Sequence, residues 1–410
     1  MRTVPFFLDT FPRTRRPAYP RQRGELQTDV LIVGGGLTGC ACALSFATAG
    51  VRVTLVESDR LGAGATAASA GLLRQDFDAS FQDSARRYGL RAARHLWQSG
   101  RRASLDFAAA IRRAGIRCDL APQDLMLFTR EGAEAARRLK REYQARRDAG
   151  LDVTWLNAAA IARETAVEAN GAIRIKGDAI DPYRACVGLA AAAVARGAVI
   201  YEGTAVRRIR AGRKSVTVKT RSGVITSSAV VIATGAPIDD LKALRRHFVA
   251  RETYLVLTEP LPAAVRRQAG KRTASLVDAP PSPGPASPHL LRWMKDDRIL
   301  FAGADQAPMP ARARAKTLTQ RAGQLMYELS TLYPAVSGLQ PEWAWDLGHQ
   351  QSVDGLPIVG LHRNFPRHLF ALGHGRHGAG VAWLAARLLL RHYLGEPGKG
   401  DDLFGFSRIL

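Results

Sequence analysis

The first part of the chain alternates short apolar runs with a helix-forming stretch. The apolar run Val30–Val33 predicts a strand, and three glycines then lead into an alanine-rich stretch that predicts a helix ending at Gly50. A second apolar run, Val51–Val56, predicts the next strand. The order strand, glycine turn, helix and strand indicates a βαβ unit with parallel strands.

In the middle of the chain, the residue spacing that predicts helices or strands changes twice. Between about residues 84 and 147, Arg, Ala and Leu recur at three- and four-residue spacings with a break near Pro122, which predicts a helical insertion. A further helix is predicted at about 183–195, and the chain then returns to the first sheet through short strands. These strands are expected around Val199, Val206, Val216 and Val230.

The C-terminal part combines strands, two helices and an irregular loop. Strands are predicted at 254–258 and 299–303, and a helix at about 316–332. Five prolines within residues 278–288 predict an exposed loop, because proline removes a backbone donor and fixes φ. A closing unit is expected from residues 355–360, 369–373 and an apolar helix at about 378–393.

The composition indicates a globular protein of two or three domains. The chain has 410 residues, 46% of them hydrophobic, which is enough for a sizeable core. Its formal net charge of +23 raises the alternative of a basic scaffold that binds nucleic acid. The arginines are spread through every segment instead of forming blocks, which favours a solvated surface and no specific nucleic-acid partner.

The four cysteines and the apolar stretches bear on the compartment. Cys40, Cys42, Cys118 and Cys186 are too few for a disulfide framework in so long a chain, so we expect a reducing, cytoplasmic location. Residues 30–51 carry no charge, but their glycine run would break a membrane-spanning helix, so no integral membrane segment is expected. Prolines after Arg16 argue against a twin-arginine signal.

The glycine turn carries the strongest chemical signal. Gly34, Gly36 and Gly39 form a GxGxxG motif between strand and helix, with Glu57 at the end of the next strand. The glycines suit a tight turn, close approach of a pyrophosphate and close helix packing, in that order. The helix start at Leu37 and Thr38 offers N–H groups and a positive dipole to phosphates. Glu57, followed by Ser58, is placed to bind a ribose hydroxyl, so the motif predicts a dinucleotide site.

Three further segments extend this pattern. Residues 61–73 are a run of small side chains and hydroxyls that lets a backbone lie along a long cofactor. The apolar strand at 231–236 ends in a tight turn at Ala233, Thr234 and Gly235. A glycine-rich turn at 373–378 leads into the last helix, whose N-terminal dipole suits a flavin carbonyl.

Taken in order, these motifs resemble the FAD-dependent D-amino-acid oxidase superfamily, which includes glycine oxidase, sarcosine oxidase and gamma-glutamylputrescine oxidase. The resemblance runs from Tyr19 to the last helix and also includes residues 204–206, 258–261 and 354–360. It implies an α/β fold in which a Rossmann-like FAD-binding domain is interleaved with an α+β substrate domain. The FAD-binding domain is then expected at 1–83, 151–240 and 342–410, and the substrate domain at 84–150 and 241–341.

The resemblance also implies which residues hold FAD. Besides the first glycine turn and Glu57, it assigns Thr66, Ala67, Gly71 and Leu72 to the ribityl chain and ring, and Val206 to the adenine. It places residues 375–378, including Gly375, His377 and Gly378, at the pyrimidine edge. The further residues expected to bind the cofactor are Ala233, Thr234, Gly235 and Gly373. Relatives with covalent flavin use a Cys in the C-terminal third or a His in the small-residue run. Here the last Cys is Cys186, and residues 67–70 contain no His, so non-covalent FAD is expected.

The substrate side is expected to depend on two arginines and a histidine. Arg376 matches an Arg of glycine-oxidase-like relatives and is the first candidate to bind a substrate carboxylate. His349 stands where those relatives carry a second Arg, and Leu290 where they carry a Tyr, which puts a simple amino-acid substrate in doubt. Arg292 is a candidate to compensate. The histidine spacings fit no standard ligand set, so no metal is expected.

The resemblance therefore implies oxidation of the carbon–nitrogen bond of a small amine or amino acid, with hydride transfer to the flavin and with oxygen or another acceptor taking the electrons. An FAD-dependent hydroxylase is the enzymatic alternative. Such hydroxylases carry a Gly-Asp motif after the Ala-Thr-Gly strand, whereas Gly177 and Asp178 precede that strand here.

Overall fold

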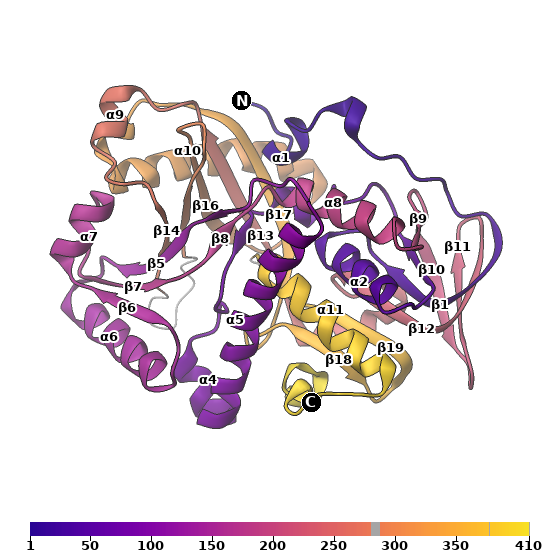
Figure 1. Ribbon diagram of the computed structural model, residues 1–410. Helices are drawn as coiled ribbons and strands as arrows, with labels where there is room; N and C mark the ends of the chain where they lie inside the picture. Colours follow the sequence, from indigo (N-terminus) through magenta and orange to yellow (C-terminus); the bar gives the residue numbers. More distant parts are fainter. Residues whose placement is uncertain (280–287, 377, 410) are drawn as a thin grey trace.

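Two eight-stranded sheets organise the part of the chain described by the computed structural model, which is residues 1–279, 288–376 and 378–409. The two sheets lie beside each other, each with helices packed against it (Figure 1). The strands of the first sheet are β1 (Gly24–Val33), β2 (Val53–Val56), β9 (Val199–Tyr201), β10 (Val206–Ala211), β11 (Val216–Thr220), β12 (Gly223–Gly235), β18 (Ile358–His362) and β19 (Phe365–Leu372).

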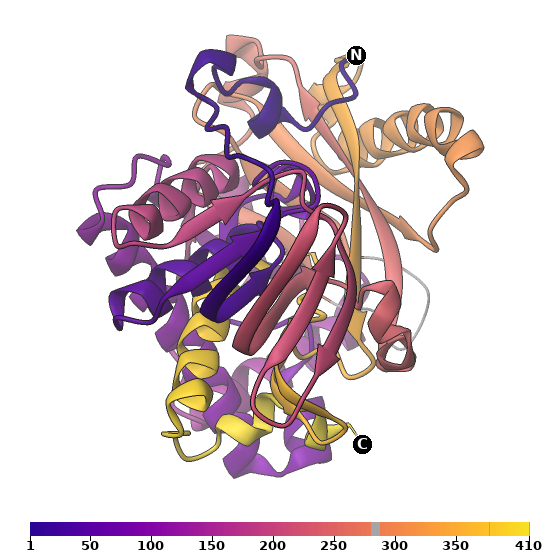
Figure 2. The same ribbon diagram turned by 90° about the vertical axis from the view of Figure 1, so that its right-hand side faces the viewer.

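The first sheet has a parallel centre. Its order is β10-β11-β12-β1-β2-β9, and β19 adds to β12 and carries β18. β12, β1, β2, β9 and β19 run parallel to their neighbours in this group, whereas β10, β11 and β18 pair antiparallel. Helices α2 (Leu37–Thr48), α8 (Pro182–Val194) and α11 (Gly378–Leu394) pack beside it. Figure 2, turned by 90° from Figure 1, brings the strands of this sheet toward the viewer.

The second sheet is mainly antiparallel and has the order β17-β13-β16-β15-β14-β5-β7-β6. Its strands are β5 (Asp124–Thr129), β6 (Val153–Leu156), β7 (Gly171–Ile175), β13 (Phe248–Thr258), β14 (Ala274–Asp278), β15 (Leu290–Trp293), β16 (Ile299–Gln306) and β17 (Pro341–Ser352). A small sheet of β3 (Leu72–Leu73), β8 (Asp178–Ala179) and β4 (Ala121–Pro122) lies apart from both.

The remaining α-helices pack on the sheets or on other helices. They are α1 (Phe6–Asp9), α3 (Ala65–Ala68), α4 (Phe81–Tyr88), α5 (Leu90–Arg113), α6 (Gly132–Asp148), α7 (Ala158–Thr165), α9 (Ala263–Arg267) and α10 (Ala311–Leu332). α10 packs on β13, β16 and β17, and α6 packs on β5, β6 and β7. No helix among the described residues has both the length and the apolarity needed to cross a membrane.

The α/β class and the βαβ start that the sequence predicts are confirmed. Several segments are placed differently from what the sequence suggests. The stretch 84–147 contains the buried strand β5 in addition to helices, because its apolar run at 125–128 is buried in the second sheet, between β14 and β7. Strands β6, β7 and β17 pair in the second sheet, whereas the sequence assigned residues 151–240 and 342–410 to the predicted FAD-binding domain. Helix α5, assigned to the substrate domain, packs against α11. The division into domains itself stays a prediction.

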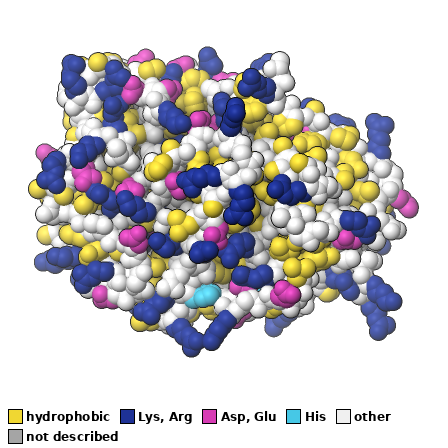
Figure 3. All heavy atoms as spheres, viewed as in Figure 1, with side chains coloured by type: hydrophobic (Ala, Val, Ile, Leu, Met, Phe, Trp, Pro, Cys, Tyr) yellow, Lys and Arg dark blue, Asp and Glu magenta, His cyan; other side chains and the backbone are white. Residues whose placement is uncertain are grey.

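The surface charge is dispersed. Figure 3 shows Lys and Arg side chains over the whole of the visible face, mixed with acidic and apolar ones. Most of the ion pairs among the described residues are formed by arginines, as in Arg52 with Asp29 and Arg391 with Asp401. On this face the basic residues therefore do not gather into a single patch.

Gly39 shows how closely the first glycine turn is packed. A Cβ atom placed on Gly39 would lie 1.9 Å from the carbonyl oxygen of Gly34, so backbone would have to move to accept any side chain. The glycine turn can therefore contact the start of α2 only because this position has no side chain.

We expect Gly39→Ala to lower the free energy of unfolding by about 1–3 kcal/mol, the usual cost of overpacking. Urea unfolding followed by circular dichroism measures this. Gly323→Ala is the matched control, because Gly323 is also helical and a Cβ there meets nothing within 4 Å. Equal stability of the two variants would contradict the close contact at Gly39.

Candidate active site

The turn after β1 presents bare backbone to a cavity. Gly34 has a φ of +107° and its N–H donates to the carbonyl of Val56 at 2.9 Å. A Cβ on Gly34 would lie 2.7 Å from the carbonyl oxygen of Ala233, at the end of β12. Gly36 is the residue before α2 and faces Thr66, whose hydroxyl accepts a hydrogen bond from the N–H of Leu37 at 2.9 Å.

Glu57 follows β2 and fixes the loop around the turn. Its Oε2 accepts from the N–H of Gly35 at 2.6 Å, and its Oε1 accepts from the Ser58 hydroxyl and the Asp59 N–H at 2.9 Å each. The carboxylate therefore ties the glycine turn to the start of the next loop. Its predicted contact with a ribose stays a prediction.

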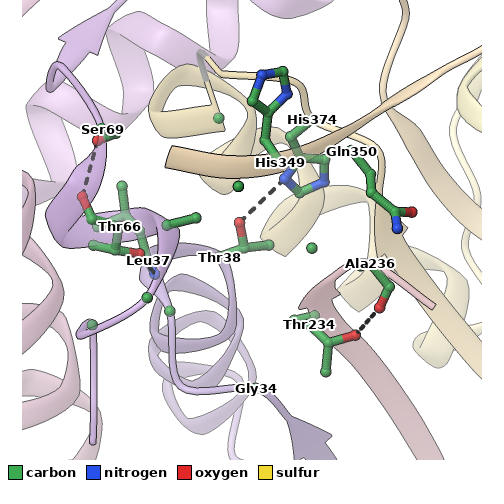
Figure 4. Close-up of a pocket in the computed structure, with 18 of the residues that line it drawn as sticks. Gly34, Leu37, Thr38, Thr66, Ser69, Thr234, Ala236, His349, Gln350 and His374 are labelled. Atoms are coloured by element: carbon green, nitrogen blue, oxygen red, sulfur yellow. Dashed lines mark hydrogen bonds between the residues drawn. The ribbon is translucent and has the colours of Figure 1, made fainter. Parts of the chain in front are cut away.

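A second glycine turn follows β19 and meets the first. The N–H of Gly375 donates to the carbonyl of Gln350 in β17 at 2.9 Å. The His374 Nδ1 lies 3.5 Å from the hydroxyl of Thr38 in α2, so the two turns are in contact although 336 residues separate them (Figure 4). His377, which the sequence placed in this turn, lies outside the described residues.

One cavity of about 580 Å³ extends along both turns. From the predicted cofactor set, the described residues that line it are Gly34, Gly36, Leu37, Thr38, Glu57, Ser58, Thr66, Val206, Ala233, Thr234, Gly235, Gly375 and Gly378. Gly39, Ala67, Gly71, Leu72 and Gly373 are not in its lining. Gly71 packs against another part of the chain, since a Cβ on it would be 2.4 Å from the carbonyl oxygen of Ile180.

The far end of this cavity contains polar atoms without partners. Within the described ranges, His349 Nδ1, Gln350 Oε1 and His374 Nε2 are buried and have no hydrogen-bond partner. All three residues line the cavity. Because buried polar groups are normally satisfied, these atoms indicate that the cavity is built for a polar ligand.

Burial keeps both histidines neutral. Desolvation lowers the pKa of His374 to about 4. Desolvation also lowers the pKa of His349 to about 4, with Arg376 and Arg251 acting in the same direction and Asp305 opposing them. The His349 Nε2 lies 3.0 Å from the Thr253 hydroxyl, which orients the ring. At neutral pH this end of the cavity therefore contains two uncharged imidazoles.

A larger cavity of about 1320 Å³ adjoins the first. His349 and Arg376 line both cavities and so mark the junction. The wall of the second cavity includes a buried ion network in which Arg74 contacts Asp76 and Asp78 at 2.8 and 3.0 Å. Burial raises the pKa of Asp78, and nearby Asp305 acts in the same direction although Arg74 and Arg376 oppose it.

The network continues into the helices of the second cavity. Arg146 contacts Asp76 at 3.3 Å and Glu142 at 2.8 Å. Glu142 in turn accepts from the N–H groups of Phe81 and Gln82 at the start of α4, at 2.7 and 3.0 Å. These buried carboxylates and guanidinium groups are paired, so they fix the shape of the wall.

The structure separates the two candidate arginines. Arg376 is 8% exposed and faces both cavities. Arg292 is in the lining of neither. Its Nη1 donates to the carbonyls of Ala70 and Ile180, and its guanidinium stacks on Phe7 at 5.6 Å. These donors hold the small-residue run in place, and the expected contact of Arg292 with the substrate stays a prediction.

Several residues of the site carry no local sequence signal. Gln350, Asp305 and Asp78 enter the cavity walls from β17, β16 and the loop before α4. None belongs to a sequence motif, and only their position in space near Arg376 and His349 identifies them. Among the described residues there is no group of three or more His, Cys, Asp or Glu side chains arranged to hold a metal ion.

Comparison with known proteins places the chain among flavoproteins. The sequence profile of the FAD dependent oxidoreductase family matches residues 29–391. The chain is similar to glycine oxidase of Geobacillus kaustophilus, with 30% identity over 396 residues that cover 92% of this chain and 96% of the relative. It is also similar to gamma-glutamylputrescine oxidoreductase of Escherichia coli, with 26% identity over 385 residues that cover 92% of this chain and 86% of the relative.

Solved structures share the fold. The crystal structure of glycine oxidase from Geobacillus kaustophilus superposes with a TM-score of 0.76 at 23% identity and covers 94% of this chain and 100% of that chain. The L-proline dehydrogenase of P. horikoshii superposes with a TM-score of 0.75 at 18% identity and covers 94% of this chain and 98% of that chain. The interleaved architecture expected from the sequence is therefore confirmed.

His374, at the contact of the two turns, predicts that the folded protein loses stability in acid. Because the pKa of His374 is about 4 in the folded chain and 6.5 is its ordinary value, the stability that depends on its neutral form is present above pH 6.5 and is lost as the pH falls toward 4. The loss is at most about 1.4 kcal/mol per pH unit.

We expect His374→Gln to lose less stability than the wild type between pH 6.5 and 4, as measured by urea unfolding across that range. His95→Gln is the control, because His95 lies on α5 and lines neither cavity. If His374→Gln and the wild type lose stability in parallel, the neutral state of His374 is not what the fold depends on.

Proposed function

The chain belongs to the FAD-dependent oxidoreductase family, and from this premise we propose that it oxidises the carbon–nitrogen bond of a small amine or amino acid. The family identifies the chain as an enzyme that uses FAD. Two relatives are named for glycine and for gamma-glutamylputrescine, an amino acid and an amine. Oxygen or another acceptor would take the electrons.

The single observation that carries this proposal is the continuous cavity along both glycine turns. It reaches from Glu57 and Val206 at one end to His349 and Arg376 at the other. An FAD molecule needs such a span, because its adenosine and its redox ring lie at opposite ends of a pyrophosphate. The backbone of Gly34 and Gly36 and the helix start at Leu37 suit the phosphates.

When bound, FAD supplies a ring that accepts a hydride from the carbon bearing the nitrogen. The chain supplies the surroundings. Neutral His349 and His374 place no positive charge against the substrate amine at neutral pH. We assign His349 Nδ1, which has no partner among the described residues, as the acceptor of a hydrogen bond from that amine. Arg376 is positioned to hold a carboxylate where the substrate has one.

We further propose that the two sheets divide the work. The loops after β1, β2 and β12 and the turn after β19 would hold FAD. β16, β17 and the loop before α4 would contact the substrate through Asp305, His349 and Asp78.

Purified protein tests this function directly. We expect a flavin spectrum, and we expect bleaching under anaerobic conditions by at least one member of a panel of D-amino acids, glycine, sarcosine, proline derivatives, simple amines and polyamine conjugates. The control is the same panel with the amines replaced by the corresponding alcohols. A colourless protein that does not take up added FAD, or a flavin that no amine reduces, would sink the proposal.

The attachment of FAD can be tested separately. The small-residue run has Ala67, Ala68, Ser69 and Ala70 where a His would be needed, and Cys186 is buried behind the glycine turn, 3.5 Å from the carbonyl of Gly35. We expect acid precipitation to release the flavin into the supernatant, measured by its absorbance. Yellow colour that stays with the pellet after washing would show a covalent bond instead.

A further inference from the structure

Arg376 already has partners where a substrate would meet it. Its Nη1 lies 3.5 Å from Asp305 Oδ1, and its Nη2 donates to the carbonyl of Pro288 at 2.6 Å. Asp78 adds a second carboxylate nearby, since a Cβ on Gly375 would lie 2.8 Å from Asp78 Oδ2. The positive charge of Arg376 is therefore compensated before any ligand arrives.

A bulge in β16 places Asp305 in the cavity. Glu252 of β13 pairs with Gln306 and Tyr254 pairs with Gly303, so Thr253 alone faces both Ala304 and Asp305. Ala304 has a φ of +53°, a backbone conformation that residues other than glycine rarely adopt. Bulges next to active sites redirect a side chain, and here the Asp305 carboxylate, whose side chain is 16% exposed, faces the second cavity.

Arg251 of β13 lies near His349 but is exposed, so solvent screens its charge. The buried groups around the pair do not restore a positive charge. His349 lines the same junction and is neutral at physiological pH, because its pKa is about 4. Arg74 is engaged by Asp76 and Asp78. A substrate carboxylate that approaches Arg376 therefore meets the like charge of Asp305 at short range, or must displace it, and both cost free energy in a buried site.

On the basis of the proposed function, we propose that Asp305 is a specificity-determining residue that competes with substrate carboxylates for Arg376. The site then favours amines whose reacting carbon carries no free carboxylate. Such substrates are simple amines, or amino acids whose carboxylate is converted to an amide or ester. Arg376 can bind a carboxylate, but in this chain Asp305 occupies it.

Two probes of the same shape test the competition. Benzoate and benzamide are titrated into the FAD-loaded protein, and binding is followed by the change in flavin absorbance. We expect the wild type to bind benzoate no more tightly than benzamide. We expect Asp305→Asn to bind benzoate about tenfold more tightly, with benzamide unchanged within about twofold, because only the charged probe gains from the removed carboxylate.

The gain must depend on Arg376. In the double variant Asp305→Asn with Arg376→Ala, we expect the benzoate affinity to return to that of Arg376→Ala alone. With an amino acid and the amine of the same side chain as substrates, Asp305→Asn should raise kcat/KM for the amino acid relative to the amine, mainly through a lower KM. Asp305→Glu keeps the charge and should keep the wild-type preference.

Asp346→Asn is the matched control, because Asp346 is also a strand carboxylate paired with an arginine, Arg314, and lines neither cavity. It should leave both probes unchanged. The proposal is overturned if the wild type prefers benzoate, a result that needs no variant, or if Asp305→Asn leaves the benzoate affinity unchanged. In either case the flavin could still be reduced by amines, so the proposed function would remain. A protein that binds no flavin would contradict the proposed function itself.

Discussion

The carboxyl-terminal edge of the first sheet is the constraint on which the candidate site depends. β1, β2, β12 and β19 are joined by parallel pairings, so their ends at Val33, Val56, Gly235 and Leu372 reach the same edge. The loops that follow these strands line one cavity. In open α/β sheets a ligand binds at this edge, because only there do several loops converge. The close contact of Gly34 with the carbonyl of Ala233 lets the loops meet without side chains between them.

The second sheet contributes polar and charged side chains to the site, whereas the first sheet contributes mainly backbone. β16 and β17 bring Asp305 and His349 to the junction of the two cavities, and the bulge at Ala304 sets the direction of Asp305. Because these groups are buried, the electrostatic interactions between them are strong. A carboxylate 3.5 Å from a buried guanidinium changes what that guanidinium can bind, whereas the many ion pairs on the surface contribute little.

Much of the fold could be predicted because its signals are local. The βαβ start, the last helix and the helix near 316–332 follow from periodicity and turn residues, and the structure has them as β1, α2, β2, α11 and α10. Strand β5 was missed because a short apolar run inside a helical stretch does not reveal whether it is buried in a sheet or in a helix core. The surroundings of Arg292 could not be predicted for a related reason, since its partners are backbone carbonyls at residues 70 and 180, far away in the chain.

The sequence by itself determined the FAD-binding architecture, because glycine spacing, strand ends and small-residue runs act through the backbone of consecutive residues. Only the tertiary structure decided which charges meet at the substrate end. Arg376 and Asp305 are 71 residues apart in the chain, and Asp78 is farther still. Their contact depends on strand register, a bulge and burial, which are properties of the packed chain and not of any segment in it.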